Sequence, residues 1–186
     1  KKNIVRNDLY LLGISNYKIK KYNEAIQYLK QVKQDNDSLS ESTFLHLGHS
    51  YLRIDNLEHA KLAYAAAIQI NKNPVLREEA MYNYTQITYL QNSALGESIT
   101  AFQMFIKEYP NSKYIDKIYA FMADLYLNSK NYMAALNALL EIQNPNEQVL
   151  QTRQYLRYQL AVDAFLQNKM SDVLKWTNEV IVNEPN

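Results

Sequence analysis

The chain has 186 residues, of which 47% are hydrophobic, and its formal net charge is +1 at pH 7. This near-neutral charge argues against a nucleic-acid-binding domain, which usually carries a strongly basic face, and the absence of cysteine excludes disulfides, thiolate zinc sites and cysteine nucleophiles. With only 3 Gly and 4 Pro, the chain lacks the frequent turns of a β-sandwich or barrel, so we expect an all-α protein. No apolar run approaches the roughly 20 residues that a membrane-spanning helix needs.

Five consecutive segments each have the pattern of two helices separated by a short polar break. Taken in chain order, the segments are residues 6–39, 40–73, 74–110, 111–146 and 147–186. Their central breaks lie at residues 18–23, 53–56, 91–96, 128–131 and 167–172. Breaks this short join antiparallel helices into hairpins. The sequence therefore predicts ten helices in five hairpins and no strands.

The second segment shows how the two helices of a hairpin are expected to pack. Between residues 44 and 67, the small residues Gly48, Ala60 and Ala67 alternate with large ones at helical spacing. This alternation predicts that each small residue accommodates a large side chain of the partner helix. Residues equivalent to Gly48 recur 35 to 38 positions apart, and they are Gly13, Gly48, Gln86, Ala123 and Ala161. A near-fixed period in this range is typical of stacked helical units, so residues 1–186 are predicted to form a single array.

Several short motifs predict where the helices begin and end. Residues 38–41, with the form Ser-x-x-Glu, are interpreted as a capping box. The pairs Asn73-Pro74 and Asn144-Pro145 each place a cap residue before a proline at the first helical position. Residues 109–112 (Tyr-Pro-Asn-Ser) are expected to stop one helix and to offer Asn or Ser as the cap of the next. Residues 114–118 are interpreted as a lengthened first helix.

These residues resemble the tetratricopeptide repeat (TPR). Its pattern has a large residue at position four, Leu-Gly at seven and eight, Tyr at eleven and Ala at twenty. The second segment matches nearly throughout, with Phe44, Leu47-Gly48, Tyr51 and Ala60 in these places. Gln86 departs from the small residue expected at position eight of the third segment. The resemblance covers essentially the whole chain and implies an α–α superhelix, a TPR solenoid of about five hairpins, which would be a segment of a longer array.

A second likeness concerns residues 102–126, where Phe102, Phe105, Tyr114 and Tyr126 surround the Tyr-Pro-Asn-Ser motif. This stretch looks like the repeats of bacterial envelope proteins, namely the outer-membrane assembly lipoproteins and the periplasmic coordinator of the Tol–Pal system. The likeness favours a bacterial periplasm or cell-envelope setting over the cytoplasm, although the compartment itself is not fixed by the sequence.

The TPR resemblance also implies a partner-binding groove, because the first helix of each hairpin lines the concave face in that family. Carried over position by position, the implied groove residues are Tyr10, Ile14, Tyr17, Leu45, His49, Leu52, Arg53, Asn83, Ile87, Leu90, Asp124, Leu127, Asn128, Tyr158 and Val162. Tyrosines and aliphatic residues beside polar ones suit an extended or helical peptide with several apolar anchors. The chaperone-binding subclass instead carries Lys and Asn where Tyr10 and Ile14 stand, so its carboxylate clamp is absent.

No motif for catalysis, a cofactor or a metal is found. His46 and His49 are three residues apart and could face the same way, but no third or fourth ligand stands at a suitable spacing, so they are interpreted as a solvent-facing or groove-lining pair. Glu78 and Glu79 are interpreted as favourable charges near a helix start. We therefore expect a non-enzymatic protein-interaction scaffold that binds a protein or peptide partner. We expect no nucleic-acid partner, and the uncapped terminal repeats could also support self-association.

Two alternatives stay open. The chain could be the sensing or regulatory section of a larger bacterial signalling protein whose catalytic or DNA-binding part lies outside these residues. It could also be an RNA-binding helical repeat of similar period, although the near-neutral charge disfavours this interpretation.

Overall fold

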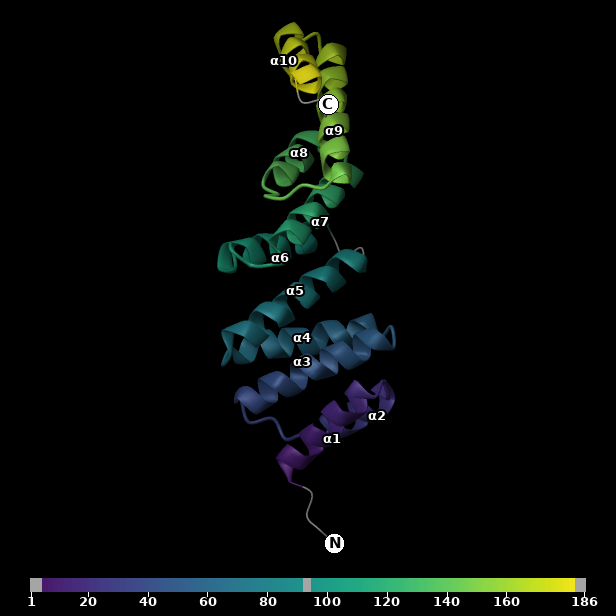
Figure 1. The fold of residues 1–186 in the computed structure, drawn as a ribbon, viewed down its shortest axis with the longest axis vertical. Coiled ribbons are helices and arrows are strands. Elements are labelled where there is room, and N and C mark those ends of the chain that lie inside the picture. The colour runs from purple at the N-terminus through teal and green to yellow at the C-terminus, as the bar shows by residue number, and fades with distance from the viewer. Residues whose placement is uncertain (1–4, 92–94, 183–186) are drawn as a thin grey trace. The chain divides into compact units, whose positions relative to one another are not determined.

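The computed structural model describes residues 5–91 and 95–182, and within these ranges the chain forms helices and short loops without any strand (Figure 1). The ten helices found there are α1 (Arg6–Lys18), α2 (Tyr22–Leu29), α3 (Ser38–Arg53), α4 (Leu57–Ile70), α5 (Pro74–Leu90), α6 (Leu95–Glu108), α7 (Ile115–Asn128), α8 (Tyr132–Leu140), α9 (Glu147–Leu166) and α10 (Met170–Val182). The predicted all-α fold and helix number are confirmed. Part of the predicted break at 91–96 and the last residues of the fifth segment lie outside the described residues.

The chain divides into two compact units, Lys1–Phe105 and Ile106–Asn186. In the N-terminal unit, α1 pairs with α2 and α3 with α4, and the hairpins adjoin through α2 on α3 and α4 on α5. In the C-terminal unit, α7 pairs with α8 and α9 with α10, and α8 packs on α9. Each unit therefore consists of helix hairpins in sequence order. The single array across the whole chain stays a prediction.

In the first two hairpins a glycine lets the two helices approach closely, as the small–large alternation predicts. A Cβ atom added to Gly48 on α3 would lie 2.6 Å from the ring of Tyr64 on α4, and one added to Gly13 on α1 would lie 2.5 Å from Leu29 on α2. Real Cβ contacts are never this short, so both positions have room only for hydrogen. Tyr64 and Leu29 are fully buried, and the close approach of the helices is what buries them.

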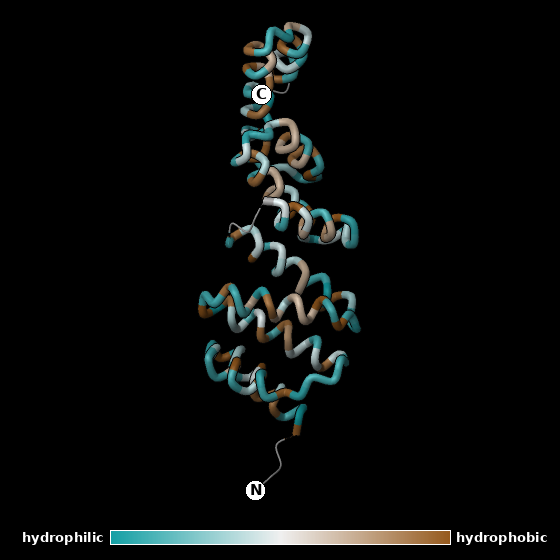
Figure 2. The backbone as a smooth tube through the Cα atoms, turned by 180° about the vertical axis from the view of Figure 1, so that it is seen from behind, coloured by the Kyte–Doolittle hydropathy of each residue, from teal (hydrophilic) through white to brown (hydrophobic). Residues whose placement is uncertain are grey.

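Each unit has its own hydrophobic core. In the N-terminal unit, Leu45, Ala60, Tyr64, Ala67, Ala80 and Ile87 form one buried cluster. In the C-terminal unit, the core includes Ala123, Ala135, Leu136, Leu139, Leu156, Ala161 and Trp176. Figure 2 colours the backbone by hydropathy and shows hydrophobic and hydrophilic stretches alternating along the helices, as expected when one face of each helix is buried. Trp176 on α10 packs in this C-terminal core.

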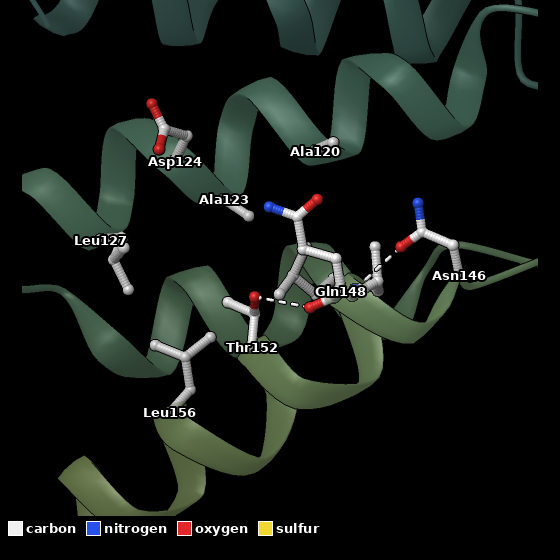
Figure 3. Close-up of a pocket in the computed structure, with 10 residues that line it drawn as sticks. Ala120, Ala123, Asp124, Leu127, Asn146, Gln148, Thr152 and Leu156 are labelled. Carbon is white, nitrogen blue, oxygen red and sulfur yellow. Dashed lines mark hydrogen bonds between the residues drawn. The ribbon is translucent and has the colours of Figure 1, made fainter.

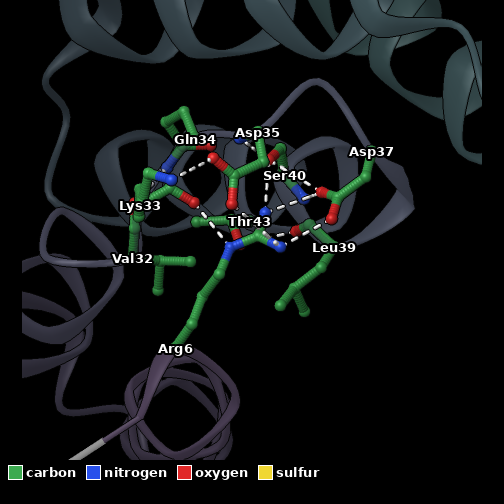
Figure 4. A network of polar contacts seen from close by, with 9 residues as sticks. All are labelled: Arg6, Val32, Lys33, Gln34, Asp35, Asp37, Leu39, Ser40 and Thr43. Atoms are coloured by element: carbon green, nitrogen blue, oxygen red, sulfur yellow. Dashed lines mark hydrogen bonds and ion pairs between the residues drawn. The ribbon is translucent and has the colours of Figure 1, made fainter.

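The start of α3 corrects one sequence prediction. The carboxylate of Asp37, not a residue of the predicted Ser38–Glu41 box, accepts the hydrogen bond from the backbone N–H of Ser40 at 2.9 Å. The guanidinium of Arg6 on α1 donates to Asp37 and to Ser40 (Figure 4). This guanidinium holds the pKa of Asp37 well below its usual range. The cap of α3 is thus also the link between α1 and α3.

Glu41 has a different role from the one that the box would give it. Its side chain is fully buried and accepts hydrogen bonds from the backbone N–H groups of Lys72 and Asn73, at 3.2 and 2.8 Å. These two residues form the turn between α4 and α5. Glu41 therefore fastens the second hairpin to the start of the third.

Of the two helix starts predicted at an Asn-Pro pair, one is confirmed and one is wrong. Asn73 caps α5 by accepting from Val75 and Leu76, with Pro74 in the first turn, as predicted. The prediction that α9 starts at Pro145 is wrong, because Asn146 provides the cap and accepts from Val149 at 2.9 Å.

Around residues 109–112, α6 ends at Glu108 as expected, but Tyr114 is the N-cap of α7 and makes no side-chain capping bond. The hydroxyl of Ser112 accepts from the backbone N–H of Tyr114 at 3.1 Å instead. The Tyr-Pro-Asn-Ser motif therefore stops one helix without capping the next through Asn or Ser.

Candidate functional site

The residues predicted to line a groove differ in how far they reach the surface. Leu45 and Ile87 are 2% and 0% exposed, so they belong to the core and cannot contact a partner in this structure. Leu90 and Tyr158 are 59% and 57% exposed. Arg53 and Asn128 are also exposed, and the remaining nine are partly buried: Tyr10, Ile14, Tyr17, His49, Leu52, Asn83, Asp124, Leu127 and Val162.

The N-terminal unit brings four aromatic side chains of α1 and α3 together. The ring centroid of His46 lies 5.9 Å from that of Tyr10, 6.1 Å from that of Tyr17 and 6.0 Å from that of His49. All three pairs meet edge to face, an arrangement that aromatic rings favour. We call this group, Tyr10, Tyr17, His46 and His49, the tyrosine–histidine cluster. Arg53 lies at the edge of this group, where Tyr17 raises the pKa of its guanidinium.

His49 connects three helices through both ring nitrogens. Its Nε2 lies 3.1 Å from the carboxylate of Glu79 on α5, and its Nδ1 lies 2.7 Å from the hydroxyl of Tyr64 on α4. A carboxylate only accepts, so Nε2–H donates to Glu79, and in the neutral ring Nδ1 accepts from Tyr64. Burial raises the pKa of Tyr64, which keeps its hydroxyl protonated as that donor.

His46 is held as a neutral ring. Burial lowers its pKa, and its Nδ1–H donates to the backbone carbonyl of Ser42, 2.7 Å away. Both nitrogens of His49 and one of His46 are therefore engaged by protein atoms. Across residues 5–91 and 95–182, no group of three or more His, Cys, Asp or Glu side chains is placed to hold a metal ion.

The C-terminal unit contains a cleft of about 370 Å³ between α7 and the first turns of α9 (Figure 3). Two predicted groove residues, Asp124 and Leu127, line it from α7. In Figure 3, Ala123 and Leu127 of α7 point toward Thr152 and Leu156 of α9, whereas the carboxylate of Asp124 points away from α9. The other lining residues are Ala120, Ala123, Leu139, Asn146, Gln148, Val149, Thr152 and Leu156.

The α9 wall of this cleft escaped the position-by-position prediction because α9 is longer than a repeat helix. With Ala161 at position eight, position one is residue 154, yet α9 begins at Glu147 and has 20 residues. Its first two turns therefore carry no repeat position. The lengthened first helix that was expected at 114–118 is instead α9, since α7 begins at Ile115. The spacing of the units gave no signal, because the 38 residues between Ala123 and Ala161 equal the 38 between Gly48 and Gln86.

Arg153 fixes these extra turns of α9 against α8. Its guanidinium donates to the backbone carbonyls of Leu139 and Ile142, at 2.6 and 3.2 Å. These carbonyls lie at the end of α8, where backbone acceptors have no partner within the helix. Burial, with a smaller effect from neighbouring Arg157, lowers the pKa of Arg153. The cleft wall is thus tied to the hairpin core.

A second, smaller cavity of about 230 Å³ lies in the N-terminal unit between α4, α5 and α6. Ile68, Met81, Tyr84 and Met104 are among its lining residues, and almost all of its surface is apolar. None of the predicted groove residues lines it. None of the helices that the structure describes combines the length and apolar character needed to cross a lipid bilayer.

Known proteins similar to this chain share its helical repeats. Two family models described as tetratricopeptide repeat match residues 9–37 and 79–112, and residues 42–74. Together they cover just over half of the chain and fall within the first three predicted segments, apart from a few residues at the boundaries. No curated protein sequence matches the chain.

Two crystal structures of nearly identical TPR-like repeats, from a Podosopora anserina protein described as a kinesin light chain and from a variant of it, have a similar fold. Each is 13% identical in sequence to this chain. Each comparison covers 95% of this chain and 93% of the matched chain, with TM-scores of 0.55 and 0.54. At this identity the likeness shows the fold alone, and the bacterial envelope setting stays a prediction. From the repeat matches, the glycine-closed hairpins and the fold, we conclude that the chain belongs to the tetratricopeptide repeat family.

Proposed function

We propose that this chain is a non-enzymatic scaffold that holds a peptide or helix of a partner protein against its first helices, α1, α3, α5, α7 and α9. Tetratricopeptide repeats generally mediate protein–protein interaction, and solenoids of this type use extended concave surfaces for binding. The observation that carries the proposal is the cleft between α7 and α9, which contains the predicted residues Asp124 and Leu127.

The chemistry of the cleft suits a peptide. Its volume lies in the range of natural ligand sites, with Leu127 and Leu156 providing apolar surface. Gln148 adds a side-chain amide in the middle of the cleft, beside Ala123, and Asn146 adds one at the end opposite Leu127 (Figure 3). An amide offers both donors and an acceptor, which matches the C=O and N–H groups of a peptide backbone. An extended segment can thus place an apolar side chain in the cleft and pair its backbone with the amides.

The N-terminal unit offers a second surface of the same kind. Tyr10 and Tyr17 of the tyrosine–histidine cluster are partly exposed, as are parts of His46 and His49. Tyrosine combines an apolar ring with a polar hydroxyl and is enriched in the centres of protein interfaces. This surface supports anchoring of apolar or aromatic side chains of a partner.

The test compares variants of exposed first-helix residues with variants of second-helix residues of similar exposure. Leu90→Ser and Tyr158→Ser alter exposed predicted groove positions, whereas Leu62→Ser on α4 and Leu174→Ser on α10 alter residues that are 68% and 64% exposed. Binding of short, terminally blocked random peptides to the full chain is measured by fluorescence anisotropy. Each first-helix variant should weaken binding by roughly fivefold to tenfold, about 1 kcal/mol, and the second-helix variants should leave it unchanged.

Circular dichroism of all four variants should show unchanged helicity, because each altered side chain is mostly solvated. The proposal fails if no peptide pool binds the wild-type chain. It also fails if Leu62→Ser and Leu174→Ser weaken binding as much as the first-helix variants do.

A further inference from the structure

The apolar cavity of about 230 Å³ in the N-terminal unit is bounded by three helices. Its lining includes Ala65 and Ile68 from α4, Met81 and Tyr84 from α5, and Met104 from α6. None of the described residues that line it is charged. Met104 is 49% exposed, so part of the lining reaches the protein surface and a small molecule can enter from solvent.

The cavity offers few hydrogen bonds to water inside it. Its polar lining side chains are those of Gln69, Tyr84 and Thr85, and almost all of its surface is apolar. The hydroxyl of Thr85 donates to the backbone carbonyl of Tyr82 at 2.7 Å, and Gln69 is exposed to the outer solvent. A buried water molecule needs about two to four polar partners. Water in this cavity is therefore poorly held, and an apolar molecule that displaces it gains free energy.

The three helices that form the walls are tied together by polar contacts around the cavity. The ammonium of Lys61 on α4 lies 2.6 Å from the carboxylate of Glu97 on α6 and 5.7 Å from the ring centroid of Tyr84 on α5. The buried hydroxyl of Ser98 on α6 donates to the backbone carbonyl of Thr88 on α5 at 3.1 Å. The walls are thus held in place without a ligand, as is usual for small-molecule sites.

We propose that this cavity binds small uncharged aromatic molecules, at a site that shares no residue with the predicted groove. Apolar cavities of about 150 Å³ hold benzene, so this larger cavity has room for a ring system such as indole. Methionine sulfur contacts aromatic rings favourably, and Met81 and Met104 both line the cavity. The ring of Tyr84 adds an aromatic wall. A charged molecule is excluded, because it would lose its hydration without gaining a partner.

The experiment observes the methyl groups of the five methionines of the full chain by NMR while indole, toluene or benzoate is added. Met81 and Met104 line the cavity, whereas Met122, Met133 and Met170 do not. Indole and toluene should shift the Met81 and Met104 resonances, with dissociation constants of roughly 0.1–1 mM. The other three resonances should stay in place. Benzoate, which has the ring of toluene and a carboxylate in place of its methyl group, should shift none of the five.

Two alanine variants assign the binding to the cavity. Ala65→Leu places a larger side chain in the cavity and should weaken indole binding by about tenfold or more, because the free volume is filled. Ala66→Leu is the matched control, since Ala66 is the next residue of α4, is likewise partly buried and does not line the cavity. It should leave indole binding unchanged. Circular dichroism checks that both variants keep their helicity.

Three results would overturn this inference. The first is that neither indole nor toluene shifts the Met81 or Met104 resonance, and the second is that benzoate shifts them as strongly as toluene does. The third is that Ala65→Leu binds indole as tightly as Ala66→Leu does. Peptide binding to the first helices is measured separately, so the proposed function stands or falls independently of these results.

Discussion

Gly48 shows how far single residues could be interpreted from the sequence. Its place in the small–large alternation predicted a close contact with the partner helix, and the structure places the ring of Tyr64 where a Cβ would be. The partners of His49 were not predicted. Glu79 lies 30 positions further along the chain, and it meets His49 only because α3 packs on α5. Local spacing reports contacts within a hairpin, whereas contacts between hairpins depend on how the hairpins pack.

Replacing Gly48 should therefore destabilise the N-terminal unit. Gly48→Leu should reduce the free energy of unfolding by about 1–3 kcal/mol, because the new side chain overpacks the site against Tyr64. Gly96 is the matched control, since nothing lies within 4 Å of a Cβ added there. Gly96→Ala on α6 should be neutral or stabilising by up to about 1 kcal/mol. Thermal and urea unfolding measure both changes, and an unaltered melting temperature for Gly48→Leu would contradict the assigned packing.

His46 should make stability depend on pH in the range just below neutral. Burial lowers its pKa in the folded chain, whereas the unfolded chain takes up the proton at about pH 6.5. The unfolded state thus binds more protons as the pH falls through that range, and stability decreases. Between about pH 7 and pH 5, wild type should lose roughly 1 kcal/mol relative to His46→Gln, which cannot titrate there.

Asp37 affects stability in a different, more acidic pH range. Its pKa is lowered by the Arg6 guanidinium, so the stability that it contributes is present above about pH 4, the usual aspartate pKa, and is lost only in more acidic solution. Urea unfolding from neutral pH down to about pH 5 therefore keeps Asp37 out of the measurement, and the comparison with His46→Gln subtracts the other titrating groups. Parallel pH profiles of wild type and His46→Gln would rule out the neutral buried histidine.

At the scale of the helices, the sequence predicted well which helices exist and in what order, but it predicted less well the residues at which they begin. The cap of α5 at Asn73 was correct because its signal is local. The start of α3 was assigned to the wrong pair because Glu41 bonds to a turn more than 30 residues away. The extra turns of α9 were missed because a repeat pattern defines positions only within its own length. These extra turns form one wall of the C-terminal cleft, so the candidate site was only half visible in the sequence.

Removing the Glu41 tether should loosen the junction between the second and third hairpins. Glu41→Ala removes the acceptor of the backbone N–H groups of Lys72 and Asn73 and leaves a void where a fully buried side chain stood, at a cost of about 2–4 kcal/mol in the free energy of unfolding. Glu41→Gln keeps a carbonyl oxygen at the same place and should cost clearly less. Hydrogen exchange of the Lys72 and Asn73 amides checks the mechanism. Equal stability of the Ala and Gln variants would argue against the tether.

At the scale of the whole molecule, the periodic pattern predicted the five hairpins because each hairpin repeats the same local packing. The division into units ending at Phe105 and beginning at Ile106 has no such signal, since it falls inside α6. Each unit presents its own candidate surface, the tyrosine–histidine cluster in one and the cleft between α7 and α9 in the other. Both surfaces are formed mainly by first helices.

The most direct test of the account is to map where peptides bind. Blocked random peptides carrying a photoreactive phenylalanine analogue are cross-linked to the full chain, and the attachment sites are located by mass spectrometry. The account predicts attachment on first helices, near Tyr17, Leu90, Leu127 and Tyr158. Attachment concentrated on the second helices, around Leu62 and Leu174, would contradict it.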